Sequence, residues 1–359
     1  MIRAFRTPYA MMVGVSDLNA FVAGLPKAEL HVHHVGSASP RIVAELAARH
    51  EGTSPVPADP EVLRDYFVFR DFAHFIEVYL TVVDLIRTPE DVAMLTYEVA
   101  RDLTGQNVRY AELTVTPYTS IERGIAAEPF CEAIEDARGR AARDFGIELA
   151  WCFDIPGEAG LPAADATVEV ALGVRPDGLV SFGLGGPEVG VPRAQFAPHF
   201  DRARAAGLHS VPHAGESTGP ETIWDAVRHL GAERIGHGIA ASRDPDLMAH
   251  LAAEGVALEV CPTSNVRTRS VSSLDEHPLP ALVAAGIAVS INSDDPPMFS
   301  TTLNDEYLVA ARLLDVGPDG LADLARSAVT TSFLADDRKK ALLVEIDDYV
   351  RSAAPPSTG

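Results

Sequence analysis

Eight short apolar segments alternate with helix-like stretches along most of this chain of 359 residues. The segments expected as strands are residues 29–33, 108–115, 147–153, 179–184, 209–213, 234–237, 256–260 and 287–292. When strands alternate with crossover helices, neighbouring strands run parallel. Eight such units predict an α/β fold, a closed TIM-like (β/α)8 barrel. An open doubly wound sheet is the alternative, but no Gly-x-Gly-x-x-Gly motif follows the first strand.

The stretch between the first two expected strands is longer than one crossover needs. It carries helical patterns at residues 41–49, 72–86 and 89–105, so we expect extra helices inserted there. No linker divides the chain, and residues 1–351 are expected to form one barrel domain. Residues 352–359 are small residues and prolines, which are typical of a disordered tail.

The composition restricts the partners of this protein. The chain has 29 basic and 51 acidic residues, a formal charge of -22. Such a charge repels nucleic acid and anionic membrane surfaces, so neither is an expected partner. Three cysteines form no disulfide framework, and a reduced cytoplasmic interior is the simplest setting. The sequence shows neither a secretory signal nor an apolar run of membrane-spanning length.

Histidines and acidic residues stand at the carboxyl ends of the expected strands, where the active groups of such barrels lie. His31 and His33 alternate with apolar residues, and side chains two apart on a strand point to the same side. His213 and Asp294 follow apolar strands elsewhere in the ring. Three imidazoles and a carboxylate are a normal ligand set for zinc or a similar divalent ion, with a position left for water.

Three more polar residues accompany this set. Glu216, three residues past His213, can reach beside the metal without binding it. His237 would act as a base or as an electrostatic partner for metal-bound water. Asp295 cannot easily share the metal with Asp294, because neighbouring side chains point apart, so we expect it to contact the substrate.

Five segments resemble, in order, the adenosine deaminase family of zinc-dependent barrel hydrolases. They are Pro-Lys-Ala-Glu-Leu-His-Val-His at 26–33, His-Ala-Gly-Glu at 213–216, Ile-Gly-His-Gly at 235–238, Cys-Pro-Thr-Ser-Asn at 261–265 and Ser-Asp-Asp-Pro at 293–296. These segments span most of the chain. The resemblance therefore implies hydrolytic deamination of a 6-aminopurine nucleoside.

The resemblance also implies one zinc ion per chain. The four implied ligands are His31, His33, His213 and Asp294. Glu216 is similar to the family's proton donor to purine N1, and His237 resembles the residue that orients the attacking water. Zinc lowers the pKa of water, so hydroxide can attack C6 and ammonia can leave. Glu216, His237 and Asp294 are thus the expected catalytic residues.

Two further positions are implied to hold the purine ring. Asp295 resembles the group that holds N7, and Gly186 resembles the family's backbone amide that faces N3. A separate class of nucleobase deaminases has a Cys-rich zinc site and the motifs H-x-E and P-C-x-x-C. This sequence has neither motif, so that class is excluded.

The chain departs from the family pattern just after the second histidine. The family usually continues Leu-Asp-Gly-Ser, whereas this chain reads His34-Val35-Gly36-Ser37. In adenosine deaminases that Asp accepts a hydrogen bond from the ribose 5'-hydroxyl, which Val35 cannot do. A buried hydroxyl without a partner costs roughly 1–3 kcal/mol, so adenosine should bind poorly. An apolar residue instead suits a carbon substituent at the 5' position, and His34 either lines the same pocket or is buried against a helix.

The His-His-Val-Gly-Ser-Ala run resembles that of actinobacterial deaminases acting on 6-amino-6-deoxyfutalosine. This nucleoside is an intermediate of the futalosine route to menaquinone, and its bulky 5' extension ends in a carboxylate. It is therefore the expected substrate. Arg70, Arg267 and Arg269 are candidates to pair with that carboxylate, although each could equally be a surface arginine.

Three other functions stay open at this stage. Adenosine or adenine could be the substrate, in purine salvage. The chain could be a non-catalytic purine-binding barrel, although such a protein should lack a metal ligand or the proton donor. A barrel hydrolase acting on a non-purine amide is a third possibility, but Glu216, Gly186 and Asp295 match ring nitrogens better than a lone carbonyl.

Overall fold

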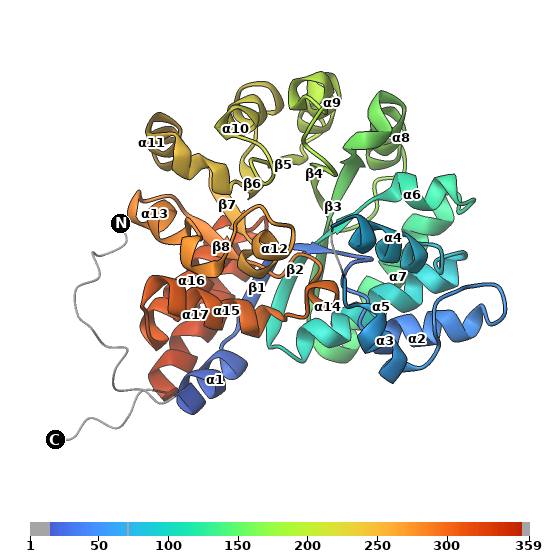
Figure 1. Cartoon of the computed structure of the whole chain (residues 1–359), viewed down its shortest axis with the longest axis horizontal. Helices are drawn as coiled ribbons and strands as arrows, with labels where there is room; N and C mark the ends of the chain where they lie inside the picture. Colours follow the sequence, from blue (N-terminus) through green and yellow to red (C-terminus); the bar gives the residue numbers. More distant parts are fainter. Residues whose placement is uncertain (1–14, 70–71, 354–359) are drawn as a thin grey trace.

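The computed structural model describes residues 15–69 and 72–353, and it contains all eight expected strands. The strands are β1 (Lys27–His33), β2 (Val108–Val115), β3 (Glu148–Pro156), β4 (Leu179–Gly185), β5 (His209–Ala214), β6 (Arg234–His237), β7 (Ala257–Val260) and β8 (Val289–Ile291). They lie side by side in chain order, and every neighbouring pair is parallel. The predicted (β/α)8 barrel is confirmed (Figure 1).

The ring closes between β8 and β1 through very few hydrogen bonds. An isolated parallel bridge joins Val32 to Asp294, just past the end of β8. The His33 amide donates to the Asp294 carbonyl at 2.9 Å, and the Asp294 amide donates to the His31 carbonyl at 3.1 Å. This seam therefore places the two histidines of β1 directly beside Asp294.

Helices surround the strands, and four of them form the predicted insertion between β1 and β2 (Figure 1). The inserted helices are α2 (Pro40–Arg49), α3 (Pro60–Tyr66), α4 (Phe72–Val83) and α5 (Pro89–Thr104). A capping box fixes the start of α5, because the Thr88 side chain accepts from the Asp91 amide and the Asp91 side chain accepts from the Thr88 amide. Arg70 lies outside the described residues.

The remaining helices follow the strands in turn or complete the ring. They are α1 (Val15–Gly24), α6 (Pro117–Glu122), α7 (Ala127–Phe145), α8 (Gly160–Gly173), α9 (Ala197–Ala205), α10 (Pro220–Asp225), α11 (Pro245–Glu254), α12 (Pro262–Arg267), α13 (Leu279–Ala284), α14 (Pro296–Phe299), α15 (Leu303–Leu314), α16 (Pro318–Thr331) and α17 (Asp336–Ala353). Since α17 runs to Ala353, residues 352 and 353 are helical rather than part of a tail. Residues 354–359 lie outside the described residues. Within the described ranges, no helix has the length and apolarity needed to cross a membrane.

The strands are buried almost throughout, as expected for a sheet that is covered by helices on one side and closed on the other. Charged side chains are nevertheless buried inside the barrel. Arg234 of β6 donates from Nε to Glu259 of β7 at 2.6 Å and also pairs with Glu112 of β2. Each of these three side chains is at most 2% exposed. They form a buried network of one guanidinium and two carboxylates below the site described next.

Candidate metal centre and active site

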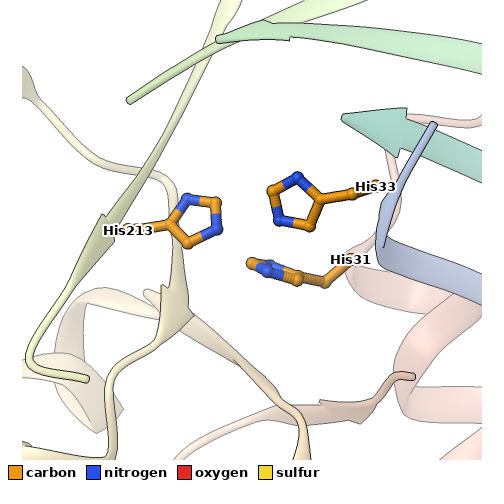
Figure 2. A group of neighbouring side chains, drawn as sticks. All are labelled: His31, His33 and His213. Atoms are coloured by element: carbon orange, nitrogen blue, oxygen red, sulfur yellow. The ribbon is translucent and has the colours of Figure 1, made fainter. Parts of the chain in front are cut away.

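Three imidazoles converge at the carboxyl ends of β1 and β5. Figure 2 shows that the side chains of His31 and His33 from β1 face that of His213 from β5. The ring centroid of His31 lies 4.5 Å from that of His213 and 5.6 Å from that of His33. One nitrogen of each ring lies within 4.8 Å of the others. A Cβ at Gly236 would come 2.7 Å from His31 Cε1, so this glycine leaves the room that the rings need.

Asp294 adds a carboxylate to this cluster. Its Oδ1 lies 3.2 Å from His33 Nε2 and 3.6 Å from His31 Nε2. Its Oδ2 accepts a hydrogen bond from Ser264 Oγ at 2.6 Å. The backbone of Asp294 has a φ of 65°, an uncommon conformation for a residue other than glycine, and such strain often occurs at functional sites. Asp294 thus lies beside His31 and His33 at the β8–β1 seam, and the same two histidines group with His213 of β5.

The residues present fit a divalent cation. His31 Nε2 and His213 Nδ1 are buried and have no hydrogen-bond partner among the described residues. Burial alone would lower the pKa of His31, yet the nearby Asp294 carboxylate and the hydrogen-bonded Glu259 carboxylate raise it to about 10. The cluster therefore attracts positive charge, and three imidazoles with one carboxylate are a set of donors that suits zinc.

Glu259 orients His31, and sequence reasoning missed this residue. Its Oε2 lies 2.8 Å from His31 Nδ1, while its Oε1 accepts from Arg234. A carboxylate on the outer nitrogen of a ligand histidine fixes the ring and leaves the other nitrogen for the metal. The available signal was a single acidic residue within the buried Ala-Leu-Glu-Val segment of β7.

Glu216 lies beside the cluster, just after β5. Its Oε2 is 3.6 Å from His237 Nε2, and its side chain is 21% exposed. Burial, the charge of Asp294 and that of Glu188 raise the pKa of Glu216 to about 8. The carboxyl group therefore carries a proton at neutral pH, as the predicted general acid requires.

The loop that carries Glu216 is held by Glu188, a second residue that sequence reasoning missed. The buried Glu188 carboxylate accepts from the backbone amides of residues 215, 216, 217 and 218, at 2.5 to 3.2 Å. Arg193 Nη2 lies 4.0 Å from Glu188 Oε1 and donates to the Gly186 carbonyl at 3.4 Å. Glu188 and Arg193 thus join the loop after β4 to the loop after β5.

The tautomer of His237 follows from a chain of hydrogen bonds. The Leu279 amide donates to His277 Nδ1 at 3.1 Å, so His277 carries its proton on Nε2 and donates to Asn265 Oδ1 at 3.2 Å. The Asn265 amide then donates to His237 Nδ1 at 3.1 Å. Burial lowers the pKa of His237 to about 4, so the ring is neutral and its proton is on Nε2. This N–H points towards Glu216 and Asp294, at 3.6 and 3.9 Å.

The two predicted purine contacts lie on opposite sides of the cluster. Asp295 is buried beside His33 and Asp294. A Cβ at Gly36 would come 1.5 Å from Asp295 Oδ1, so only glycine fits there. Burial raises the pKa of Asp295 to about 7, with the Asp294 charge adding to the shift. Gly186 follows β4 with a φ of 75°.

Acidic residues also lie on the β3 side of the mouth. Asp154 is buried near the end of β3 and accepts from Thr116 Oγ1 at 2.6 Å. Burial raises the pKa of Asp154 to about 6. Glu158, exposed in the loop after β3, carries a further carboxylate towards Gly186. Sequence reasoning named neither residue, although Asp154 also stands near a strand end.

The residues predicted to hold the 5' extension separate into two groups. His34 and Val35 line a pocket next to His33, and His34 Nε2 also bonds Thr96 of α5 at 2.8 Å. His34 is therefore buried against α5, and its place in a pocket for the 5' extension stays a prediction. Arg267 and Arg269 are exposed at the end of α12, and neither lines that pocket.

Comparisons with known proteins identify the family of this chain and proteins of similar structure. A family model described as adenosine deaminase matches residues 26–349. An aminodeoxyfutalosine deaminase of Streptomyces avermitilis is 65% identical over 95% of this chain and 95% of its own length. The structure of an adenine deaminase from Arthrobacter aurescens has a TM-score of 0.85 at 33% identity, covering 91% of this chain and 99% of that one. An amidohydrolase from Burkholderia ambifaria with bound Zn has a TM-score of 0.85 at 25% identity, covering 95% and 96%.

Proposed function

Because this chain belongs to the adenosine deaminase family, we propose that it hydrolyses 6-amino-6-deoxyfutalosine to futalosine and ammonia, a step of menaquinone biosynthesis. The observation that carries the chemistry is the position of the Glu216 carboxyl group, 3.6 Å from His237 and beside the cluster of His31, His33 and His213 with Asp294, where its pKa is raised to about 8. The identity of 65% to a curated aminodeoxyfutalosine deaminase supports the substrate.

We assign the metal to four side chains, with one Zn2+ per chain. These are His31, His33, His213 and Asp294. Their donor atoms, and the similar amidohydrolase structure with bound Zn, support this choice. When bound, a divalent ion lowers the pKa of water and so provides a nucleophile at neutral pH.

Glu216 and His237 then act on different atoms: Glu216 acts on N1 of the purine, and His237 acts on the oxygen that adds to C6. Glu216 donates its proton to N1, and this protonation makes C6 more electrophilic. It also neutralises the negative charge that would otherwise develop on the ring when the nucleophile attacks. The Nε2–H of His237 is directed towards the oxygen that adds to C6, and it stabilises the charge that develops there. The proton of the added hydroxyl group passes to the amino nitrogen, the C6–N bond breaks, ammonia leaves, and a 6-oxopurine remains.

Asp295 and Gly186 hold the purine ring in position through hydrogen bonds to N7 and N3. N7 of a purine is a hydrogen-bond acceptor, so its partner must donate. The raised pKa of Asp295 supports a protonated carboxyl group in that role. The backbone amide of Gly186 would donate to N3 from the other side of the mouth.

A substrate panel tests the proposed function. The purified enzyme would be given 6-amino-6-deoxyfutalosine, adenosine, adenine and 5'-methylthioadenosine, and the ultraviolet change from aminopurine to oxopurine would be followed. We expect the highest kcat/KM for 6-amino-6-deoxyfutalosine. Equal values for it and adenosine would overturn the substrate assignment.

Adenine is the second candidate, because the adenine deaminase from Arthrobacter aurescens shares this fold at 33% identity. It is less well supported than the first, given the higher identity to the aminodeoxyfutalosine deaminase. An adenine kcat/KM above those of all nucleosides in the panel would favour it.

A further inference from the structure

Asp294 belongs to a short segment that continues past the end of β8. The strand ends at Ile291, and residues 292–294 follow it along β1. Asp294 has a φ of 65°, and a residue other than glycine keeps such a conformation only where its surroundings fix the backbone. The contacts of the two residues before Asp294 therefore help to decide where its carboxylate lies.

Two buried side chains fasten these two residues to β1. Oε1 of Glu29 accepts from the Ser293 amide at 2.9 Å and also from the Ser293 hydroxyl group. One residue further along β1, the Leu30 amide donates to Asn292 Oδ1 at 2.9 Å. Glu29 and Asn292 are fully buried, and Ser293 is 1% exposed. Breaking either contact would leave buried polar groups without partners, which is costly.

Asn292 is also held from the opposite side. Its backbone amide donates to the Val260 carbonyl of β7 at 3.0 Å, and its Nδ2 donates to Ser290 Oγ of β8 at 2.9 Å. Residue 292 is thus fixed between β7, β8 and β1, and residue 293 is fixed to β1 by Glu29. The backbone that leads into Asp294 has little freedom left.

Glu29 acts on the metal cluster only through this backbone. It stands two residues before His31 on β1, and it is in none of the groups of side chains suited to hold a metal ion among residues 15–69 and 72–353. The hydroxyl group of Ser264 bonds the Asp294 carboxylate itself, at 2.6 Å. Glu29 instead bonds the residue whose peptide group joins directly to Asp294.

We propose that Glu29 is a positioning residue for the metal: by holding Ser293, it sets the backbone of Asp294 so that the carboxylate meets His31 and His33. Oδ1 of Asp294 lies 3.2 Å from His33 Nε2 and 3.6 Å from His31 Nε2. The inference rests on the proposed ligand set, and it adds a residue that this set does not contain. Loss of a residue that orients a metal ligand typically lowers metal affinity by about 10- to 100-fold.

The test measures the Zn2+ affinity of the full-length enzyme by competition with a chromophoric chelator. The visible spectrum of the enzyme loaded with Co2+ gives a second readout, because it reports the geometry of the ligands. Glu29→Met keeps the length of the side chain and removes the acceptor. We expect the Kd for Zn2+ to rise about 10- to 100-fold and the Co2+ spectrum to change. Glu29→Gln keeps an acceptor oxygen and should recover most of the affinity.

A milder variant and a matched control complete the design. Ser293→Ala removes only the hydroxyl bond to Glu29, so it should raise the Kd less, and it carries the test if Glu29→Met does not fold. Asp91→Asn is the control, because Asp91 is a buried carboxylate that accepts from the backbone amides of Arg87 and Thr88 at 3.1 Å, on α5. We expect Asp91→Asn to lower Tm and to leave the Zn2+ affinity and the Co2+ spectrum unchanged.

Two results would overturn the inference. The first is an unchanged Zn2+ affinity in Glu29→Met, or in Ser293→Ala where that variant carries the test. The second is an equal loss of affinity in Asp91→Asn, since Glu29 would then only support the fold. Asp294→Asn distinguishes these failures from a failure of the proposed ligand set. If Asp294→Asn binds Zn2+ as tightly as the wild type, the ligand set is wrong and the inference fails with it.

Discussion

At the scale of single residues, the protonation of Glu216 sets the expected pH dependence. Its pKa of about 8 lies above the usual range, because burial and nearby carboxylates disfavour the charged form. A general acid works only while protonated, so kcat/KM should fall as the pH rises through this pKa. A bound cation favours the carboxylate, so we expect the midpoint at or below about pH 8 in the loaded enzyme.

Replacement of Glu216 should remove both the rate and this alkaline fall. Glu216→Gln keeps the size of the side chain and cannot donate a carboxylic proton, so kcat/KM should drop by about 10²- to 10⁴-fold. Profiles of kcat/KM against pH for the wild type and the variant would measure this. An alkaline fall that survives in the variant would assign it to another group.

We expect Val35 to determine the preference of the enzyme between adenosine and 6-amino-6-deoxyfutalosine. Val35→Asp offers an acceptor to the ribose 5'-hydroxyl, and satisfying that hydroxyl is worth roughly 1–3 kcal/mol. The kcat/KM for adenosine should therefore rise by about 5- to 150-fold, while that for 6-amino-6-deoxyfutalosine falls. Val35→Thr, which is close in volume, serves as the control. If Val35→Asp leaves the ratio of the two substrates unchanged, Val35 does not face the 5' position.

At the scale of elements, Glu188 links the loops after β4 and β5. We expect Glu188→Gln to lower kcat by roughly tenfold or more, since a neutral amide holds the four backbone amides less well than a carboxylate. The charge of Glu188 also raises the pKa of Glu216. The alkaline fall of kcat/KM should therefore move to lower pH in this variant.

Glu221→Gln is the matched control for Glu188→Gln. Glu221 lies in the first turn of α10, directly after the loop that Glu188 holds, is exposed, and accepts from the Gly219 amide. We expect near-normal activity and an unmoved pH profile. A lower kcat in Glu188→Gln without a shift of the pH profile would mean that Glu188 supports the loop without tuning Glu216.

The elements also explain which site residues the sequence could reveal. His31, His33 and Asp294 were predictable because each stands at a strand end, and parallel strands in a barrel bring these ends together. Glu188 and Glu259 were not, because their contacts depend on which loops and strands meet them in the folded barrel. Short-range patterns carry no information about such partners.

At the scale of the whole molecule, the alternation of strands and helices predicted the barrel and its insertion. Apolar strands that are covered by helices have few alternatives to a parallel sheet. The seam was not predictable in the same way. The expected strand at 287–292 is only three residues long in the structure, Val289–Ile291, and the isolated bridge to β1 is made past its end, between Asp294 and Val32.

The metal should stabilise this seam. Two of its proposed ligands lie on β1, a third follows β8, and the last stands across the ring on β5. Backbone pairing between β8 and β1 is sparse, whereas β3 and β4 share six paired positions. Binding to the folded state adds stability by mass action, about 2.7 kcal/mol when the free ion exceeds its Kd a hundredfold.

Removal of the metal with a chelator should therefore abolish activity, lower Tm, and increase hydrogen exchange most strongly in β1 and in the segment after β8. Exchange in β3 and β4 should change least, and added Zn2+ should reverse all three effects. Asp294→Asn provides the control, because it should loosen the same seam and respond little to the chelator. Hydrogen exchange that rises uniformly over all eight strands would contradict this role of the metal, because the ligands would then support the barrel as a whole and not its β8–β1 seam.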